Sequence, residues 1–160
     1  MQDIQHPTSF GVFKPVGHVV VAFAPGTDLD AVCRELAEQG FDADAVQQLS
    51  PAQMIEQADG DIARASPMAA IGQELNLVKA QRELAVIGHS FLVVEAPKDE
   101  QAGRVAAVAE RHGATRAQHY GRWLIEELIG VGTTDRQVSE SPDRGLDAQT
   151  DSGRESGSAR

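Results

Sequence analysis

Cysteine is almost absent from this sequence of 160 residues, in which Cys33 stands alone. An intrachain disulfide and a cage of thiolate ligands around a metal ion are therefore both excluded. Cys33 also falls on the apolar stripe of a predicted helix, whereas a nucleophilic thiolate needs an exposed, electropositive setting. We therefore predict that Cys33 is a packing residue.

Positive charge is scarce as well. Lys and Arg together number 14 against 24 Asp and Glu, and the formal net charge is −10. Proteins that bind nucleic acids concentrate basic residues on one face, where they displace the counterions of phosphates. The same charge balance disfavours docking to anionic membrane surfaces. We predict no nucleic-acid partner and no membrane partner.

Long hydrophobic runs and aromatic rings are rare too. The longest apolar run, residues 19–24, is far too short to span a bilayer. The first residues lack the basic and apolar regions of a secretory signal, so we expect a cytoplasmic protein. Aromatic residues make up only 4% of the chain, and the predicted core is therefore mostly aliphatic.

The composition changes along the chain and suggests three parts. Residues 133–160 are almost entirely polar or small, and such a segment cannot bury enough surface to offset its ordering entropy. We predict a flexible N-terminal segment over residues 1–16, a single α+β domain over 17–130 and a disordered tail over 131–160.

An internal repeat organises the predicted domain. The same series occurs twice: a Gly-His pair, an aliphatic strand, an Ala-Pro pair, a helix and a glycine. The first copy has Gly17-His18, Ala24-Pro25 and Gly40, and the second has Gly88-His89, Ala96-Pro97 and Gly113. Each copy ends in a more polar strand. Two βαβ units separated by helices predict the ferredoxin-like split βαβ fold with a helical insertion between the halves. A flavodoxin-like parallel sheet ranks second, because it would need more aliphatic strands.

The hydrophobicity of the strands supports this order. Residues 19–23 and 91–94 are aliphatic and are predicted at the sheet centre, whereas 45–49 and 115–120 are polar and are predicted at its edges. Predicted helices begin at Thr27, at Ser50-Pro51 (a short one) and at Ser66-Pro67 (a long one reaching Ile87), and a fourth spans 99–111. The segment Trp123–Ile129 extends the last strand or forms a helix, and helical spacing fits it better.

No stretch carries a recognisable catalytic motif. The sequence has no phosphate-binding glycine loop, no nucleophile elbow and no local His-His spacing of a metal site. His18 and His89 recur at matching strand entries, where bonding to the backbone is the simplest role. The sequence therefore indicates no metal, no cofactor and no catalytic residue.

Two segments are candidates for ligand or partner binding. Asn76 and Lys79 share one surface of the long predicted helix. His119, Tyr120, Arg122 and Trp123 form a polar-aromatic cluster that holds the only Tyr and the only Trp of the chain. Amphipathic rings beside an arginine are typical of recognition surfaces and equally of a sheet rim.

Three short similarities to known families accompany these patterns. The turn Pro25-Gly26-Thr27-Asp28, with Gly40-Phe41 after the helix, resembles the Pro-Gly turn of ACT-type regulatory domains, which implies amino-acid binding at a dimer interface. The first half is similar to bacterial general-stress domains of the heat-induced type. The whole ordered part resembles uncharacterised small proteobacterial cytosolic proteins that end in Tyr-Gly-Arg-aromatic, here Tyr120-Gly121-Arg122-Trp123.

The leading hypothesis is a non-catalytic binding or regulatory module with a role in stress. The alternatives are an ACT-like ligand-binding domain and an enzyme on a dimeric ferredoxin-like scaffold, in which His119, Tyr120 and Arg122 perform acid–base chemistry. A buried His119 with a carboxylate partner in a deep pocket would favour the enzyme, and a flat exposed rim would favour binding. We also expect a homodimer that buries the apolar residues Trp123, Leu124, Leu128 and Ile129. The two helices of a ferredoxin-like sheet leave its other face uncovered, and a second subunit or the long helix from Pro67 would cover that face.

Overall fold

The computed structural model describes residues 8–9, 12–13, 15–65, 73–122 and 124–130. Most of the predicted flexible segment 1–16, the predicted tail 131–160 and Trp123 lie outside these residues. The expectations placed on them are not tested. Among the described residues, no helix has the combination of length and apolarity that crossing a bilayer requires.

The protein is an α+β structure built on a five-stranded antiparallel sheet. Its strands are β3 (His18–Phe23), β4 (Val46–Leu49), β5 (Ser90–Glu95), β6 (Arg116–Tyr120) and β7 (Ile125–Ile129), and their order is β4-β5-β3-β6-β7. The two aliphatic strands β3 and β5 are neighbours inside the sheet, as their hydrophobicity predicts. Strands β1 (Thr8–Ser9) and β2 (Val12–Phe13) pair antiparallel in a separate two-stranded sheet.

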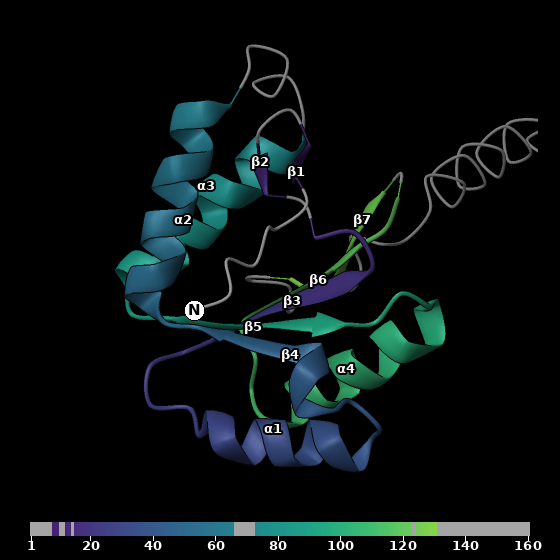
Figure 1. Cartoon of the computed structure of the whole chain (residues 1–160). Coiled ribbons are helices and arrows are strands. Elements are labelled where there is room, and N and C mark those ends of the chain that lie inside the picture. Colours follow the sequence, from purple (N-terminus) through teal and green to yellow (C-terminus); the bar gives the residue numbers. More distant parts are fainter. Residues whose placement is uncertain (1–7, 10–11, 14, 66–72, 123, 131–160) are drawn as a thin grey trace, which may run out of the picture.

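Helices cover both faces of this sheet (Figure 1). Helices α1 (Leu29–Glu38) and α4 (Asp99–Arg111) lie on one face, and α2 (Pro51–Arg64) and α3 (Gln73–Val86) on the other. The single-turn helix η1 (Ala43–Ala45) leads into β4. Side chains alternate along β3: Val19, Val21 and Phe23 pack towards α1 and α4, while Val20 and Ala22 pack towards α2 and α3.

Local capping explains where the helices start. At the first helix the cap is Asp28 rather than Thr27, because the Asp28 carboxylate accepts a hydrogen bond from the Ala31 amide at 3.1 Å. Ser50 and Gln53 form the reciprocal capping box of α2, followed by Pro51 at the first position. The prediction of a short helix here is wrong, since α2 runs through Gly60 to Arg64 and packs along α3.

The helical interpretation of residues 123–129 is also wrong. Residues 125–129 form β7, which pairs with β6, so β6 is not the edge strand that its polarity suggested. A bulge explains the misleading pattern: Ala117 pairs with Ile129 and Gln118 with Glu127, which leaves Leu128 as an extra residue on β7. Leu128 and Ile129 therefore pack on the same core and imitate the i, i+3, i+4 spacing of a helix.

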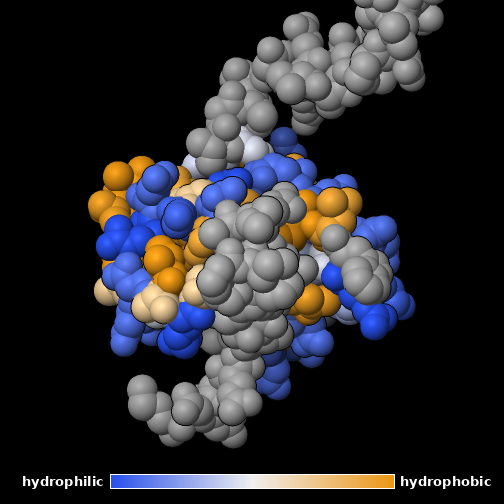
Figure 2. All heavy atoms as spheres, turned by 90° about the horizontal axis from the view of Figure 1, so that it is seen from above, coloured by the Kyte–Doolittle hydropathy of each residue, from blue (hydrophilic) through white to orange (hydrophobic). Residues whose placement is uncertain are grey.

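The covering of the second sheet face removes one argument for a dimer. The expectation of a homodimer rested partly on an apolar face left open, and α2 and α3 bury that face within the chain. Seen from the α2–α3 side, the surface drawn in colour shows hydrophobic groups scattered among hydrophilic ones (Figure 2). Scattered apolar side chains are normal for a protein surface.

Candidate functional site

The β6–β7 hairpin carries polar side chains on both faces of the sheet. Tyr120 pairs with Ile125, His119 with Glu126 and Gln118 with Glu127. Because neighbouring side chains of a strand point to opposite faces, His119 and Glu126 share one face and Gln118 and Glu127 the other. The turn is tight at Gly121, whose amide donates to the Leu124 carbonyl at 2.9 Å.

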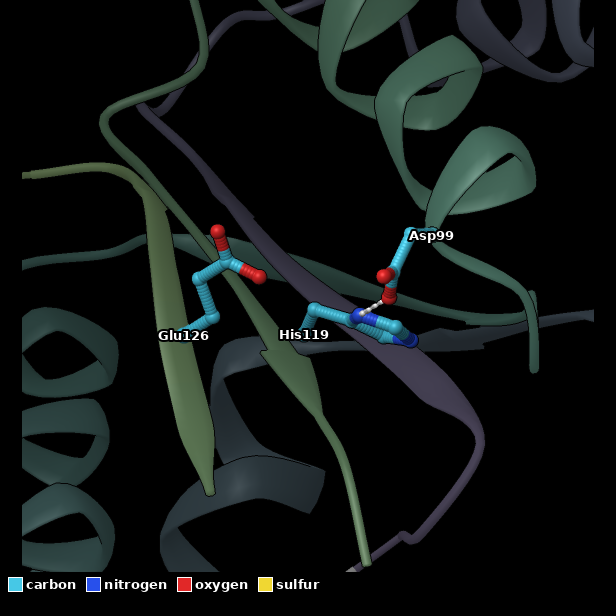
Figure 3. A group of neighbouring side chains, drawn as sticks. All are labelled: Asp99, His119 and Glu126. Carbon is cyan, nitrogen blue, oxygen red and sulfur yellow. Dashed lines mark ion pairs between the residues drawn. The ribbon is translucent and has the colours of Figure 1, made fainter.

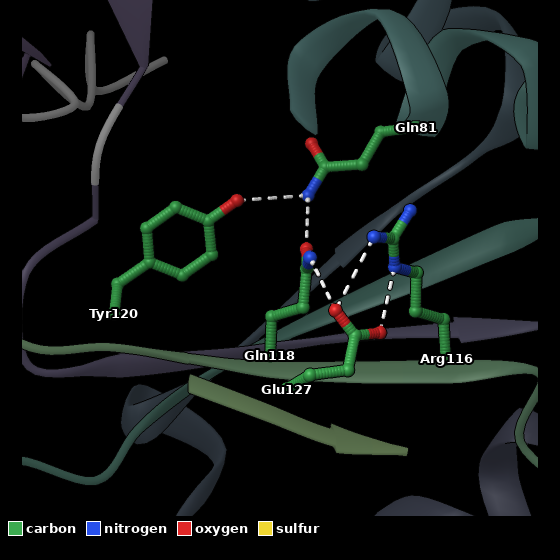
Figure 4. Close-up of polar contacts among 5 residues, drawn as sticks. All are labelled: Gln81, Arg116, Gln118, Tyr120 and Glu127. Carbon is green, nitrogen blue, oxygen red and sulfur yellow. Dashed lines mark hydrogen bonds and ion pairs between the residues drawn. The ribbon is translucent and has the colours of Figure 1, made fainter. Parts of the chain in front are cut away.

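On the α2–α3 face the polar groups form a closed network (Figure 4). The Gln81 amide on α3 donates to the Tyr120 hydroxyl at 3.1 Å and to the Gln118 side-chain carbonyl at 3.5 Å. Gln118 donates in turn to Glu127 at 3.1 Å, and Arg116 holds both oxygens of Glu127 at 2.9 and 3.2 Å. Gln81, Gln118 and Tyr120 are buried. Buried polar groups that satisfy each other in this way stabilise and specify a core.

On the α1–α4 face the polar groups are arranged differently (Figure 3). The His119 ring is buried, and its Nε2 lies 2.9 Å from the Ala96 carbonyl oxygen. Its Nδ1 lies 3.8 Å from an Asp99 carboxylate oxygen, too far for a hydrogen bond. Glu126 approaches from β7, and the three residues each place one ligand atom within 4.8 Å of the others.

These residues border an open groove of about 380 Å³. Pro97, Arg122 and Leu124 also line it, and Leu124 is 67% exposed. The groove is thus lined by a largely buried imidazole, two carboxylates and the apolar side chain of Leu124. An arrangement of one imidazole and two carboxylates can bind a cation or a small polar molecule, or transfer a proton.

The start of α4 positions Asp99 on this groove. Pro97 ends the extended segment after β5, and the Gln101 side chain accepts a hydrogen bond from the Lys98 amide at 3.0 Å. Asp99 is the first residue of α4, where negative charge is favourable beside the helix N-terminus. Its side chain is almost fully exposed, so it is held at the groove by its backbone and is free to rotate.

The structure separates the residues proposed from the sequence. His119 and Arg122 line the groove, but Tyr120 points to the opposite face and belongs to the closed network. Asn76 and Lys79 are exposed on α3, on the far side of the sheet from α4. The cluster of His119, Tyr120 and Arg122 proposed for acid–base chemistry is therefore not formed as such.

Two residues of the groove, Asp99 and Glu126, were missed by the sequence analysis. They lie 20 and 7 positions from His119, in different elements, so no local spacing marks them. A hairpin turn at Gly121 would have aligned His119 with Glu126, but helical spacing was preferred for that segment. The residues Gln81 and Gln118 of the closed network were missed as well.

Other sequence candidates have simple structural roles. Cys33 is half-buried against the core, and its sulfur accepts a hydrogen bond from Gln48 at 3.3 Å beside a small apolar hollow of about 200 Å³. His18 contacts the Val16 carbonyl at 3.1 Å, as predicted, whereas His89 contacts the Thr115 hydroxyl at 3.0 Å rather than the backbone. At the Pro-Gly turn the Asp28 carboxylate itself caps α1. It therefore occupies the place that an anion would take.

Comparisons of the chain with protein-family models, with curated proteins and with solved structures give no match. Function must therefore be argued from the residues of the site.

Proposed function

We propose that this protein is a non-catalytic binding module and that its ligand site is the groove around His119. One observation carries the proposal: a buried imidazole is fixed on one nitrogen by the Ala96 carbonyl and presents the other to two exposed carboxylates. Because His119 lines an open groove, a ligand that enters it can bond the nitrogen that Ala96 leaves available.

The form of the groove favours binding over catalysis. It is open, and the carboxylate closest to His119 is almost fully exposed to solvent. Acid–base enzymes gain from excluding water and from fixing their groups within hydrogen-bond distance. An enzyme in which His119 and Asp99 act as an acid–base pair stays the second candidate, because the imidazole is buried beside a carboxylate.

We propose the ferredoxin-like split βαβ arrangement, with an added strand and a helical insertion, as the scaffold. The order β4-β5-β3-β6, the antiparallel pairing of all neighbours and the placement of α1 and α4 on one face support this assignment. Helices α2 and α3 would be the insertion, and β7 the added strand. The similarity to stress domains adds no residue to the groove and stays a prediction.

Self-association stays a proposal as well. Leu124 is exposed at the hairpin, while Leu128 and Ile129 already pack on the core of their own chain. Leu124 is therefore the described residue of that group that is left for a partner. Sedimentation at micromolar concentration should show a dimer that Leu124→Ser weakens; a monomer at every concentration would refute it.

A fragment screen tests the proposed binding site. Chelator-treated full-length protein labelled with ¹⁵N would be titrated with small carboxylates, amines and amides while backbone amide shifts are recorded. We expect perturbations centred on Asp99, Gly121 and Glu126, and their loss in His119→Gln. His112→Gln is the matched control, because His112 pairs with a carboxylate elsewhere, at Glu35. Fragments that bind only at the Cys33 hollow, or nowhere, would overturn the proposal.

A further inference from the structure

The three groups at the groove come from three separate elements. Asp99 begins α4, His119 lies in β6 and Glu126 in β7. One ligand atom from each lies within 4.8 Å of the other two. No other group of this kind, with three His, Cys or carboxylate ligands in reach, occurs among the described residues.

The hydrogen bond of His119 defines which nitrogen is available. A carbonyl oxygen can only accept, so Nε2 carries the hydrogen that it donates to Ala96, 2.9 Å away. In the neutral ring Nδ1 then has a lone pair, and it is Nδ1 that faces Asp99. Histidines that bind metal ions commonly donate their second N–H to a backbone carbonyl or a carboxylate, which fixes the ring. The His119 side chain is only 6% exposed, so its ring is already held in place.

The contact between His119 and Asp99 differs from an ordinary ion pair. His112 and Glu35 illustrate the ordinary case, with nitrogen and oxygen 2.6 Å apart. At 3.8 Å the Asp99 oxygen is near Nδ1 but does not bond it. Donor atoms bound to the same ion stand about 3–3.5 Å apart for metal–ligand distances of roughly 2.0–2.2 Å. Small rotations of the exposed Asp99 and Glu126 side chains would reach that spacing.

The ligand chemistry selects the kind of ion. Two carboxylates and a neutral imidazole bring two negative charges, which match a divalent cation. Imidazole suits zinc and similar transition metals, whereas magnesium and calcium prefer oxygen ligands alone. Three protein ligands leave a coordination position open towards the groove for water or a small molecule.

We propose that His119 Nδ1, Asp99 and Glu126 bind a divalent first-row transition-metal ion, with zinc(II) as the probe. The inference rests on the proposed function, because it names the ligand of the same groove. A bound ion would accept the lone pair of His119 Nδ1, the nitrogen that the Ala96 carbonyl leaves available.

Calorimetric titration of zinc chloride into chelator-treated, full-length protein tests this inference. We expect a single ion per chain, and ¹⁵N shifts confined to the residues around Asp99, Gly121 and Glu126. Asp99→Asn and Glu126→Gln should each weaken binding about tenfold or more, and His119→Gln more still. The matched controls His112→Gln and Glu100→Gln should stay within about twofold, because Glu100 shares the first turn of α4 with Asp99 but does not belong to the cluster.

The outcomes separate the inference from the proposed function. No zinc binding to the wild type, or equal losses in the controls, overturns the inference. If organic fragments still bind at the groove in that case, the binding module stands without its ion. If His119→Gln fails to fold, as judged by circular dichroism, Asp99→Asn decides, because the Asp99 side chain is almost fully exposed. Unchanged zinc affinity in Asp99→Asn and Glu126→Gln would also overturn the inference.

Discussion

The two faces of the β6–β7 hairpin carry similar polar residues, but only on one face do these residues satisfy each other by hydrogen bonds. On the α2–α3 face, amides, a carboxylate and a guanidinium satisfy each other, and the hollow beside Gln81 and Gln118 has no room for water. On the α1–α4 face, a buried imidazole and two carboxylates stand apart beside an open groove. A polar group therefore indicates function less by its type than by whether the protein already satisfies it.

Removing Gln118 should have the largest effect on stability, because it breaks the closed hydrogen-bond network on the α2–α3 face. Gln118→Met keeps the volume but withdraws a donor from Glu127 and an acceptor from Gln81. We expect a loss of about 1–3 kcal/mol in the free energy of unfolding, measured by urea denaturation, with zinc affinity unchanged. The matched control, Gln48→Met on the edge strand β4, loses only a solvent-exposed hydrogen bond to the Cys33 sulfur and should change stability by less than about 0.5 kcal/mol. Equal losses in both would mean that the network contributes nothing.

Tyr120→Phe gives a smaller effect and decides on which face Tyr120 acts. The hydroxyl accepts a hydrogen bond from Gln81, so its removal should cost about 1 kcal/mol. Because the ring lies on the α2–α3 side, fragment and zinc binding at the groove should be unaffected. A double-mutant cycle with Gln81→Leu should show non-additive losses. Loss of groove binding in Tyr120→Phe would instead revive the joint site of His119, Tyr120 and Arg122.

Arg122 offers a test of the proposed cation on the α1–α4 face, where the expected effect is smaller. Arg122 also lines the groove that holds the two carboxylates, and its positive charge opposes a bound cation. Arg122→Gln should tighten zinc binding by about two- to fivefold at low salt, with the difference shrinking as salt is added. Calorimetry at two ionic strengths measures both effects. Weaker zinc binding in Arg122→Gln would contradict the assigned cation.

The smallest effect is expected from the contact of Glu35 on α1 with Arg111 and His112 at the end of α4. Hydrogen bonds from His112 and Arg111 lower the pKa of Glu35 below its ordinary value of 4.5. The stabilisation is therefore present above pH 4.5 and is lost as the pH falls through the lower folded-state pKa. Urea denaturation over this acid range should show a fall in stability that Glu35→Gln removes. Glu38→Gln, an exposed change on the same helix, should retain it.

The sequence predicted the centre of the fold better than its periphery. Continuous aliphatic runs identified β3 and β5, and proline after a serine identified the start of α2, because burial and capping are local properties. The end of the sheet was misassigned, since a bulge at Leu128 gave a strand the spacing of a helix. That error also hid the site. Glu126 meets His119 only through the hairpin register, and Asp99 only through the packing of α4 on the sheet.

The position of β7 at the outside of the described sheet has a consequence for solubility. An edge strand offers unpaired backbone groups to other chains, and charged side chains or short length discourage such pairing. Strand β4, at the opposite edge, has only four residues, while β7 carries Glu126 and Glu127 on its two faces. The carboxylate that we assign to a cation thus also repels a second β7. A bound cation would neutralise the charge of this carboxylate and so weaken the repulsion between two β7 strands. Ion binding and resistance to aggregation therefore depend on the same carboxylate.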